Sequence, residues 1–115
     1  MSRRCLILDL KDDPELIARY RAWHEPGGPP QPVIDSIRAA GIQEMEIFLS
    51  GNRLVMIMEV GPGFSPEAKA AADAADPDVR AWEEMMSAFQ QPAPWARPDE
   101  KWVETERIFI LSEQP

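Results

Sequence analysis

The sequence has one cysteine, one histidine and one tyrosine among its 115 residues. The single cysteine, Cys5, excludes an internal disulfide and is typical of a protein from a reducing compartment, so we expect a cytoplasmic location. One Cys with one His also excludes a structural zinc site of the usual Cys/His kind, and we expect no metal. No apolar run approaches the ~20 residues that cross a bilayer, so we expect no membrane partner.

Basic residues are also few: 12 Lys and Arg stand against 20 Asp and Glu, which leaves a net charge of −8. An acidic surface repels a phosphate backbone, so a nucleic acid is not an expected partner. The glycine patterns of nucleotide-binding loops and the G-x-S-x-G of hydrolases are absent as well. These absences leave a small acidic protein without the signature of a common cofactor site.

The length and composition are those of one globular domain. The chain is 44% hydrophobic and 28% charged, and domains commonly run to ~100–150 residues. A chain of this size can bury a core without disulfide or metal staples. We therefore expect a single domain over residues 1–115.

Four segments have the pattern of strands. Residues 4–10 alternate, with Leu6, Leu8 and Leu10 on one face. Residues 44–49 and 53–60 form a predicted hairpin around Ser50-Gly51-Asn52, which has the composition of a tight turn. The apolar run at residues 107–111 predicts a final strand in the centre of the sheet.

Proline residues mark the helix starts. Asp13-Pro14, Ser65-Pro66 and Asp76-Pro77 each place a capping residue before a proline at the first helical position. The predicted helices run from residue 14 to before Pro26 and over residues 32–40, 66–74 and 77–90. Residues 92–102 hold three prolines and two tryptophans and are predicted to form a surface loop.

The order of these elements predicts an α+β fold of the ferredoxin-like, split βαβ type. Such a chain has an antiparallel sheet with helices on one face. Both faces of the predicted strands carry apolar residues, so the face without helices needs a cover. A second copy of the sheet would provide it, and we expect a homodimer with the architecture of a dimeric α/β barrel.

The candidate for chemistry is His24, at the end of the first predicted helix. Tyr20 lies four residues earlier, so the two side chains share one face of the helix. A histidine titrates near physiological pH and can act as a general acid and base. The alternative is a structural histidine that caps the helix or lies half-buried. From the spacing alone, the structural role is favoured.

The tryptophans are the other candidates. Trp82 is predicted to lie on the inward stripe of its helix, either in the core or as the wall of a binding site for a ring. Trp95 and Trp102 belong to the proline-rich loop, where they could bind a ligand or anchor the loop. Glu83 and Glu84, next to Trp82, are predicted to be solvated.

Several short segments follow one another along nearly the whole chain: Tyr20-Arg21-Ala22-Trp23-His24, Ala40-Gly41-Ile42 with residues 45–48, residues 54–60, Trp82-Glu83-Glu84-Met85-Met86, and Glu106-Arg107-Ile108-Phe109. Together and in this order they resemble the L-rhamnose mutarotase family. The resemblance implies a dimeric barrel of ferredoxin-like subunits that interconverts the anomers of a 6-deoxy-L-hexose without a metal or an organic cofactor.

The resemblance also implies roles for individual residues. His24 would be the acid and base, and Tyr20 and Trp82 would bind the sugar. Met45 stands where the family has a Tyr, and Ala81 where it has the first Trp of a pair. These two departures change the contacts of the pocket and can change which epimer it accepts.

The loop that contains Trp95, with Glu100-Lys101-Trp102, looks more like the branch of this family associated with L-fucose. L-rhamnose stays open as the substrate. Two other functions also stay open on this fold: another cofactor-free enzyme of the dimeric barrel type, such as a small monooxygenase, and a non-catalytic ligand-binding module.

Overall fold

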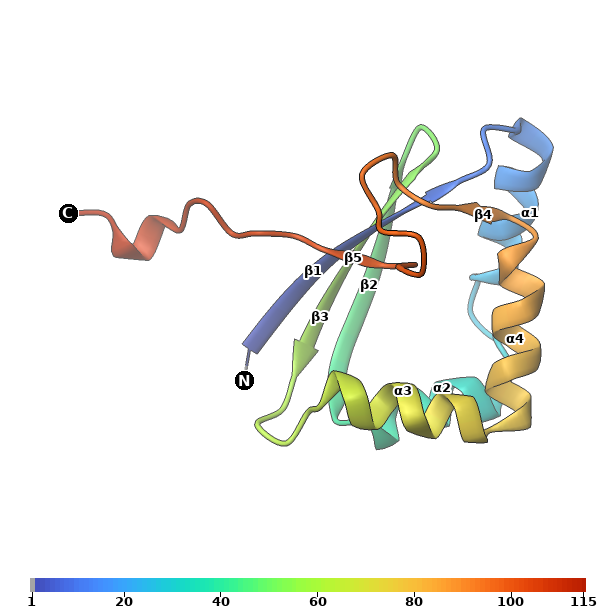
Figure 1. The fold of residues 1–115 in the computed structure, drawn as a ribbon, viewed down its shortest axis with the longest axis horizontal. Coiled ribbons are helices and arrows are strands. Elements are labelled where there is room, and N and C mark those ends of the chain that lie inside the picture. Colours follow the sequence, from blue (N-terminus) through green and yellow to red (C-terminus); the bar gives the residue numbers. More distant parts are fainter. Residues whose placement is uncertain (1) are drawn as a thin grey trace.

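The structure is a computed structural model that describes residues 2–115. Within these residues the chain forms one antiparallel sheet with the helices on one side (Figure 1). The strands are β1 (Ser2–Leu10), β2 (Ile42–Ser50), β3 (Arg53–Val60), β4 (Gln90–Gln91) and β5 (Val103–Glu104). The helices are α1 (Pro14–Trp23), α2 (Gln31–Ala39), α3 (Pro66–Ala75), α4 (Pro77–Ser87) and a short 3-10 turn, Leu111–Glu113.

The strand order is β2-β3-β1-β4, with β5 also paired to β1. This is the order of a ferredoxin-like sheet, so the predicted fold class is confirmed. The long strands β1 and β3 pair over eight residues, from Ser2↔Val60 to Asp9↔Arg53. The hairpin between β2 and β3 turns at Gly51, whose positive φ of 59° suits glycine.

The predicted helix starts are also confirmed. The carboxylate of Asp13 accepts hydrogen bonds from the first turn of α1, and Asp76 does the same for α4. Ser65 caps α3. Each capping residue is followed by a proline. Proline has no N–H, so it leaves no unpaired donor at the first helical position. Helix α4 ends at Ser87, however, and Gln90, which was predicted to be helical, lies in β4.

The core fills the space between the sheet and the helices. One buried cluster joins the end of β1 to α1 and α4, and a second lies over β2 and β3. The alternation along β3 is regular, since every second residue from Leu54 to Val60 is buried on the helix side. Within residues 2–115, no helix covers the other face of the sheet (Figure 1).

The prediction of a central final strand at residues 107–111 is wrong. Pairing with β1 stops at Thr105, whose N–H donates to the carbonyl of Cys5. The chain then leaves the sheet as an extended arm, at the red end of Figure 1. Ile108 is 88% exposed and Leu111 75% exposed. The apolar pattern predicted burial, and nothing within residues 2–115 buries these side chains.

In residues 2–115, no helix combines the length and apolar character that crossing a membrane requires.

Candidate active site

A cavity of about 480 Å³ lies between the helix side of the sheet and helices α1 to α4. Its wall is mainly apolar, with methionines from β2 and β3 on the sheet side. A few polar side chains enter it from the helices. Such an apolar cavity with a few convergent polar groups is the usual form of a small-molecule site.

Four of the predicted site residues meet at this cavity: Tyr20, His24, Met45 and Trp82. Tyr20 and His24 come from the last turn of α1, Trp82 from α4 and Met45 from β2. The i, i+4 spacing therefore placed the tyrosine and the histidine correctly on one helix face. The structure brings them together with a tryptophan that is 58 residues away from His24 in sequence.

His24 is the residue that ends helix α1. Its ring nitrogen Nδ1 lies 2.7 Å from the carbonyl oxygen of Tyr20. A carbonyl oxygen only accepts, so Nδ1 must carry the proton and donate it. In the neutral ring the other nitrogen, Nε2, then holds a free lone pair.

Aromatic rings fix the orientation of His24. The Tyr20 ring stacks on the imidazole with 4.2 Å between centroids and 28° between planes. The Trp82 ring meets the imidazole edge to face at 5.7 Å. Trp23 in turn packs against Trp82 at 6.1 Å. These contacts leave the imidazole little freedom to rotate.

Burial controls the protonation of both α1 side chains. Burial lowers the pKa of His24 below its usual 6.5, and the hydrogen bond to the Tyr20 carbonyl offsets only part of this effect. His24 is therefore neutral at neutral pH. Burial also raises the pKa of Tyr20 above 10, so its hydroxyl keeps its proton.

Gln90 is a cavity residue that sequence reasoning missed. Its amide nitrogen donates to the Tyr20 hydroxyl at 3.5 Å. Its Oε1 is buried and has no hydrogen-bond partner within residues 2–115. Gln90 lies three residues after the end of α4, at a position that was predicted to be helical, and its pairing with Leu10 of β1 turns it towards Tyr20.

Two predicted site residues lie away from the cavity. Ala81 is exposed on α4. Trp95 is 54% exposed, and the guanidinium of Arg53 lies 4.7 Å from its ring centroid. Arg53 also binds Asp9, whose neighbours Leu8 and Leu10 face the helices. The alternation of β1 therefore puts Asp9, Arg53 and Trp95 on the face of the sheet without helices.

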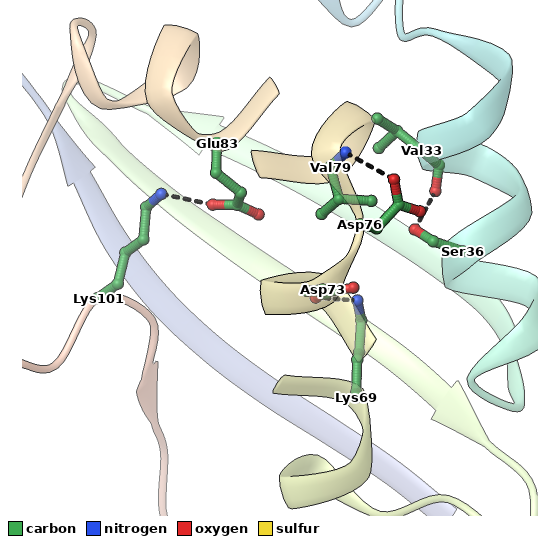
Figure 2. Close-up of polar contacts among 8 residues, drawn as sticks. All are labelled: Val33, Ser36, Lys69, Asp73, Asp76, Val79, Glu83 and Lys101. Atoms are coloured by element: carbon green, nitrogen blue, oxygen red, sulfur yellow. Dashed lines mark hydrogen bonds and ion pairs between the residues drawn. The ribbon is translucent and has the colours of Figure 1, made fainter. Parts of the chain in front are cut away.

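Two ion pairs border the cavity (Figure 2). Lys69 and Asp73 of α3 pair at 2.6 Å, one turn apart. Lys101, in the loop before β5, pairs with Glu83 of α4 at 2.7 Å. Glu83 was predicted to be solvated. Its side chain is half exposed, but it lines the cavity and binds the loop.

The fold and the site define the class of protein: a ferredoxin-like α+β chain that holds a small-molecule cavity between its sheet and its helices. Comparison with known families identifies the family within this class. The model of a family described as L-rhamnose mutarotase matches residues 3–111. The chain belongs to the L-rhamnose mutarotase family, whose members are isomerases.

Individual relatives agree with this assignment. The chain is 53% identical to the L-fucose mutarotase of Xanthomonas campestris pv. campestris over 113 residues, which cover 98% of this chain and 90% of the relative. The crystal structure of an L-rhamnose mutarotase from Formosa agariphila is similar with a TM-score of 0.67 and 18% identity, over 96% of this chain and 99% of that one.

The fold also occurs outside this family. The tetracenomycin F2 cyclase of Streptomyces glaucescens, a polyketide cyclase, is similar with a TM-score of 0.59 and 12% identity, over 96% of this chain and 98% of that one. At such low identity the likeness concerns the fold alone. Fold and function are therefore separate conclusions for this chain.

Proposed function

We propose that the chain interconverts the α and β anomers of a 6-deoxy-L-hexose, with His24 as the acid and base. The observation that carries the proposal is the state of His24 at the cavity. Its Nδ1–H is committed to the Tyr20 carbonyl, and burial keeps the ring neutral. The free Nε2 is then a base that is ready at neutral pH.

The proton balance of mutarotation suits one such group. Nε2 takes the proton of the anomeric hydroxyl, its O–H electrons form the aldehyde carbonyl, and the bond from C1 to the ring oxygen breaks. The resulting imidazolium returns the same proton to the ring oxygen. Rotation about C1–C2 and the reverse steps give the other anomer. Both oxygens are bonded to C1, so one imidazole can serve both with little movement.

Tyr20 is proposed to orient the sugar. Its hydroxyl keeps its proton because burial raises its pKa. Gln90 donates to this hydroxyl, so the proton of the hydroxyl is available to a sugar oxygen. The rings of Tyr20 and Trp82 contact His24 and line the same cavity, so a substrate ring bound there would lie near Nε2.

L-fucose is the proposed substrate ahead of L-rhamnose. The relative at 53% identity is an L-fucose mutarotase, whereas the matched family is described by L-rhamnose. The two sugars differ in the configuration of their hydroxyls, so the hydrogen-bonding groups of the cavity decide between them. Met45, on the cavity wall, offers no hydroxyl to either sugar. Both sugars have a methyl group where other hexoses have CH2OH, which suits an apolar wall.

Saturation-transfer NMR on the purified protein tests the proposal, because it measures exchange between anomers directly. We expect faster exchange for L-fucose than for L-rhamnose, and D-glucose at its spontaneous rate. The proposal fails if neither 6-deoxy sugar exchanges faster than in buffer. A higher rate with L-rhamnose would reverse the substrate order alone.

A homodimer is the proposed assembly, because nothing within residues 2–115 covers two of the apolar surfaces. Ile7, Val55 and Ile57 point to the sheet face without helices, by alternation with their buried neighbours. Phe48 pairs with Val55 on this face and is 50% exposed. The arm beyond Thr105 exposes a second apolar surface. A second copy can cover both surfaces at once, as a two-fold interface requires.

The cytoplasm is the proposed compartment. Cys5 lies half-buried in β1 and is the only cysteine, so the fold relies on no disulfide. A reducing compartment suits a protein of this kind. In that setting the protein would act on free monosaccharides of carbohydrate metabolism.

A further inference from the structure

Trp102 enters the same cavity as His24, from the opposite end of the chain. It directly precedes β5, where Glu104 pairs with Leu6 and Val103 pairs with Ile7. Side chains of paired residues lie on the same face, and faces alternate along a strand. Glu104 therefore shares the face of Leu6, and so does Trp102. Leu6 lines the cavity on the helix side of the sheet.

The position of Trp102 is central to the cavity wall. It is half-buried and packs against both core clusters, the one that contains Tyr20 and Trp82 and the one that contains Met56 and Met58. It therefore lies where the aromatic part of the wall meets the methionine part. Trp82 supplies an aromatic ring from α4, and Trp102 supplies one from the segment that joins the loop to the sheet.

An ion pair attaches this segment to α4. Lys101, next to Trp102, reaches across to Glu83, next to Trp82 (Figure 2). The two tryptophans are thus linked through their neighbours by one contact of 2.7 Å. Exposed pairs of this kind contribute little to stability. The effect of this pair is therefore mainly on the position of the loop relative to α4.

The loop itself is shaped by its own contacts. The Glu100 carboxylate accepts from the backbone N–H of Arg97 at 3.1 Å, and the Glu100 N–H donates to the Arg97 carbonyl at 3.0 Å. This turn ends at Glu100, directly before Lys101, and β5 begins two residues later at Val103. The turn and the ion pair fix Trp102 from its N-terminal side, and the pairing of β5 with β1 fixes it from its C-terminal side.

We propose that Trp102 is a substrate-binding residue that packs against the apolar face of the monosaccharide, and that Lys101 and Glu83 are the residues that position it. The inference rests on the proposed function. Monosaccharides expose C–H groups on one face of the ring, and a large aromatic surface buries them without a hydrogen-bond requirement. With Trp82 and Trp102 on different walls, the cavity can contact the sugar from two directions.

Substitution of Trp102 tests this inference through sugar affinity. In the Trp102→Leu variant we expect the Kd for L-fucose, measured by isothermal titration calorimetry, to rise about tenfold, because the aromatic surface is lost. KM should rise in parallel while kcat for anomer exchange changes less than twofold, since His24 is untouched. Trp102→Phe, which keeps a ring, should recover most of the affinity.

Trp95→Leu is the matched control. Trp95 belongs to the same loop but stacks on Arg53 on the other face of the sheet. We expect wild-type Kd and KM for this variant. Lys101→Met should raise the Kd as well, by about threefold, while its melting temperature stays within 2 °C of the wild type, as expected for an exposed ion pair.

The outcomes separate the inference from the proposed function. If Trp102→Leu binds L-fucose like the wild type, or if Leu and Phe at this position weaken binding equally, Trp102 is a packing residue and the inference is wrong. Normal exchange in the wild type would leave the proposed function standing in both cases. Absence of exchange in the wild type would overturn the function and the inference together.

Discussion

At the scale of single residues, His24 combines a fixed tautomer with a lowered pKa. The Tyr20 carbonyl holds Nδ1–H, and the rings of Tyr20 and Trp82 hold the plane of the imidazole. Each contact comes from a residue that the helix or the core already fixes. The histidine is therefore preorganised, and a substrate does not need to reorient it.

The pH dependence of kcat/KM follows from this arrangement. The active form of His24 is neutral, and burial lowers its pKa below 6.5. We expect a plateau at pH 7 to 8 and a fall of about tenfold per pH unit once the pH is below that lowered pKa. The carboxylates at the cavity, Asp73 and Glu83, are each paired with a lysine. Exchange rates for L-fucose measured from pH 4.5 to 8 check the prediction.

The same shift affects stability. Between the lowered pKa and 6.5, the unfolded chain binds more protons at His24 than the folded chain. The contribution of His24 to stability is therefore complete above pH 6.5 and is lost as the pH falls through the folded pKa. In the activity profile, a midpoint of kcat/KM above pH 6.5 would show that the group that limits activity is not His24.

Among the elements, the end of α1 determines where His24 lies. The turn after the helix folds back so closely that the Cβ of an alanine at position 28 would lie 2.3 Å from the Trp23 carbonyl oxygen. The Gly28 N–H also donates to the Glu25 carbonyl at 2.8 Å. A side chain at this position must push the turn away from the helix that carries the histidine.

We therefore expect Gly28→Ala to lower the free energy of unfolding by about 1–3 kcal/mol, as overpacking does. It should also reduce the exchange rate, because His24 lies in the displaced segment. Urea denaturation and the NMR exchange assay measure the two effects. Gly63→Ala is the control, since a Cβ there meets nothing within 4 Å. Equal stability of the two variants would show that the turn at Gly28 is not tightly packed.

The helices and strands that the sequence predicted are those that depend on local sequence patterns. The three capping residues that precede a proline located the starts of α1, α3 and α4. The hairpin and the pairing of Tyr20 with His24 followed from local spacing. Two features depended on distant partners instead. The run at residues 107–111 is apolar enough for a central strand, but an apolar pattern specifies burial without identifying the surface that provides it. The contribution of Trp102 depends on the register between β5 and β1, which no local pattern encodes.

For the whole molecule, the extended arm and the open sheet face determine the expected assembly. Deletion of residues 106–115 leaves β5 and the Thr105 bond to Cys5 in place. We expect the full chain to have twice the 13.0 kDa mass of one chain, and the truncated chain to shift towards the monomer at micromolar concentration. Light scattering after size exclusion measures both masses.

A point variant tests the same surface without truncation. Ile108→Asp places a charge on the most exposed apolar side chain of the arm and should weaken the dimer. Gln114→Asp, also on the exposed arm, adds the same charge outside the apolar run and should leave the mass unchanged. A monomeric full-length chain would contradict the proposed assembly.

The central claim is that His24 transfers the proton in anomer exchange, and one measurement tests it most directly. The saturation-transfer rate for L-fucose is compared between the wild type, His24→Ala and Glu25→Gln, with circular dichroism to confirm the fold. Glu25 is the exposed next residue and serves as the control. We predict that His24→Ala loses about 10²–10⁴-fold in enzymatic exchange, while Glu25→Gln keeps the wild-type rate. Exchange at near the wild-type rate in folded His24→Ala would contradict the account.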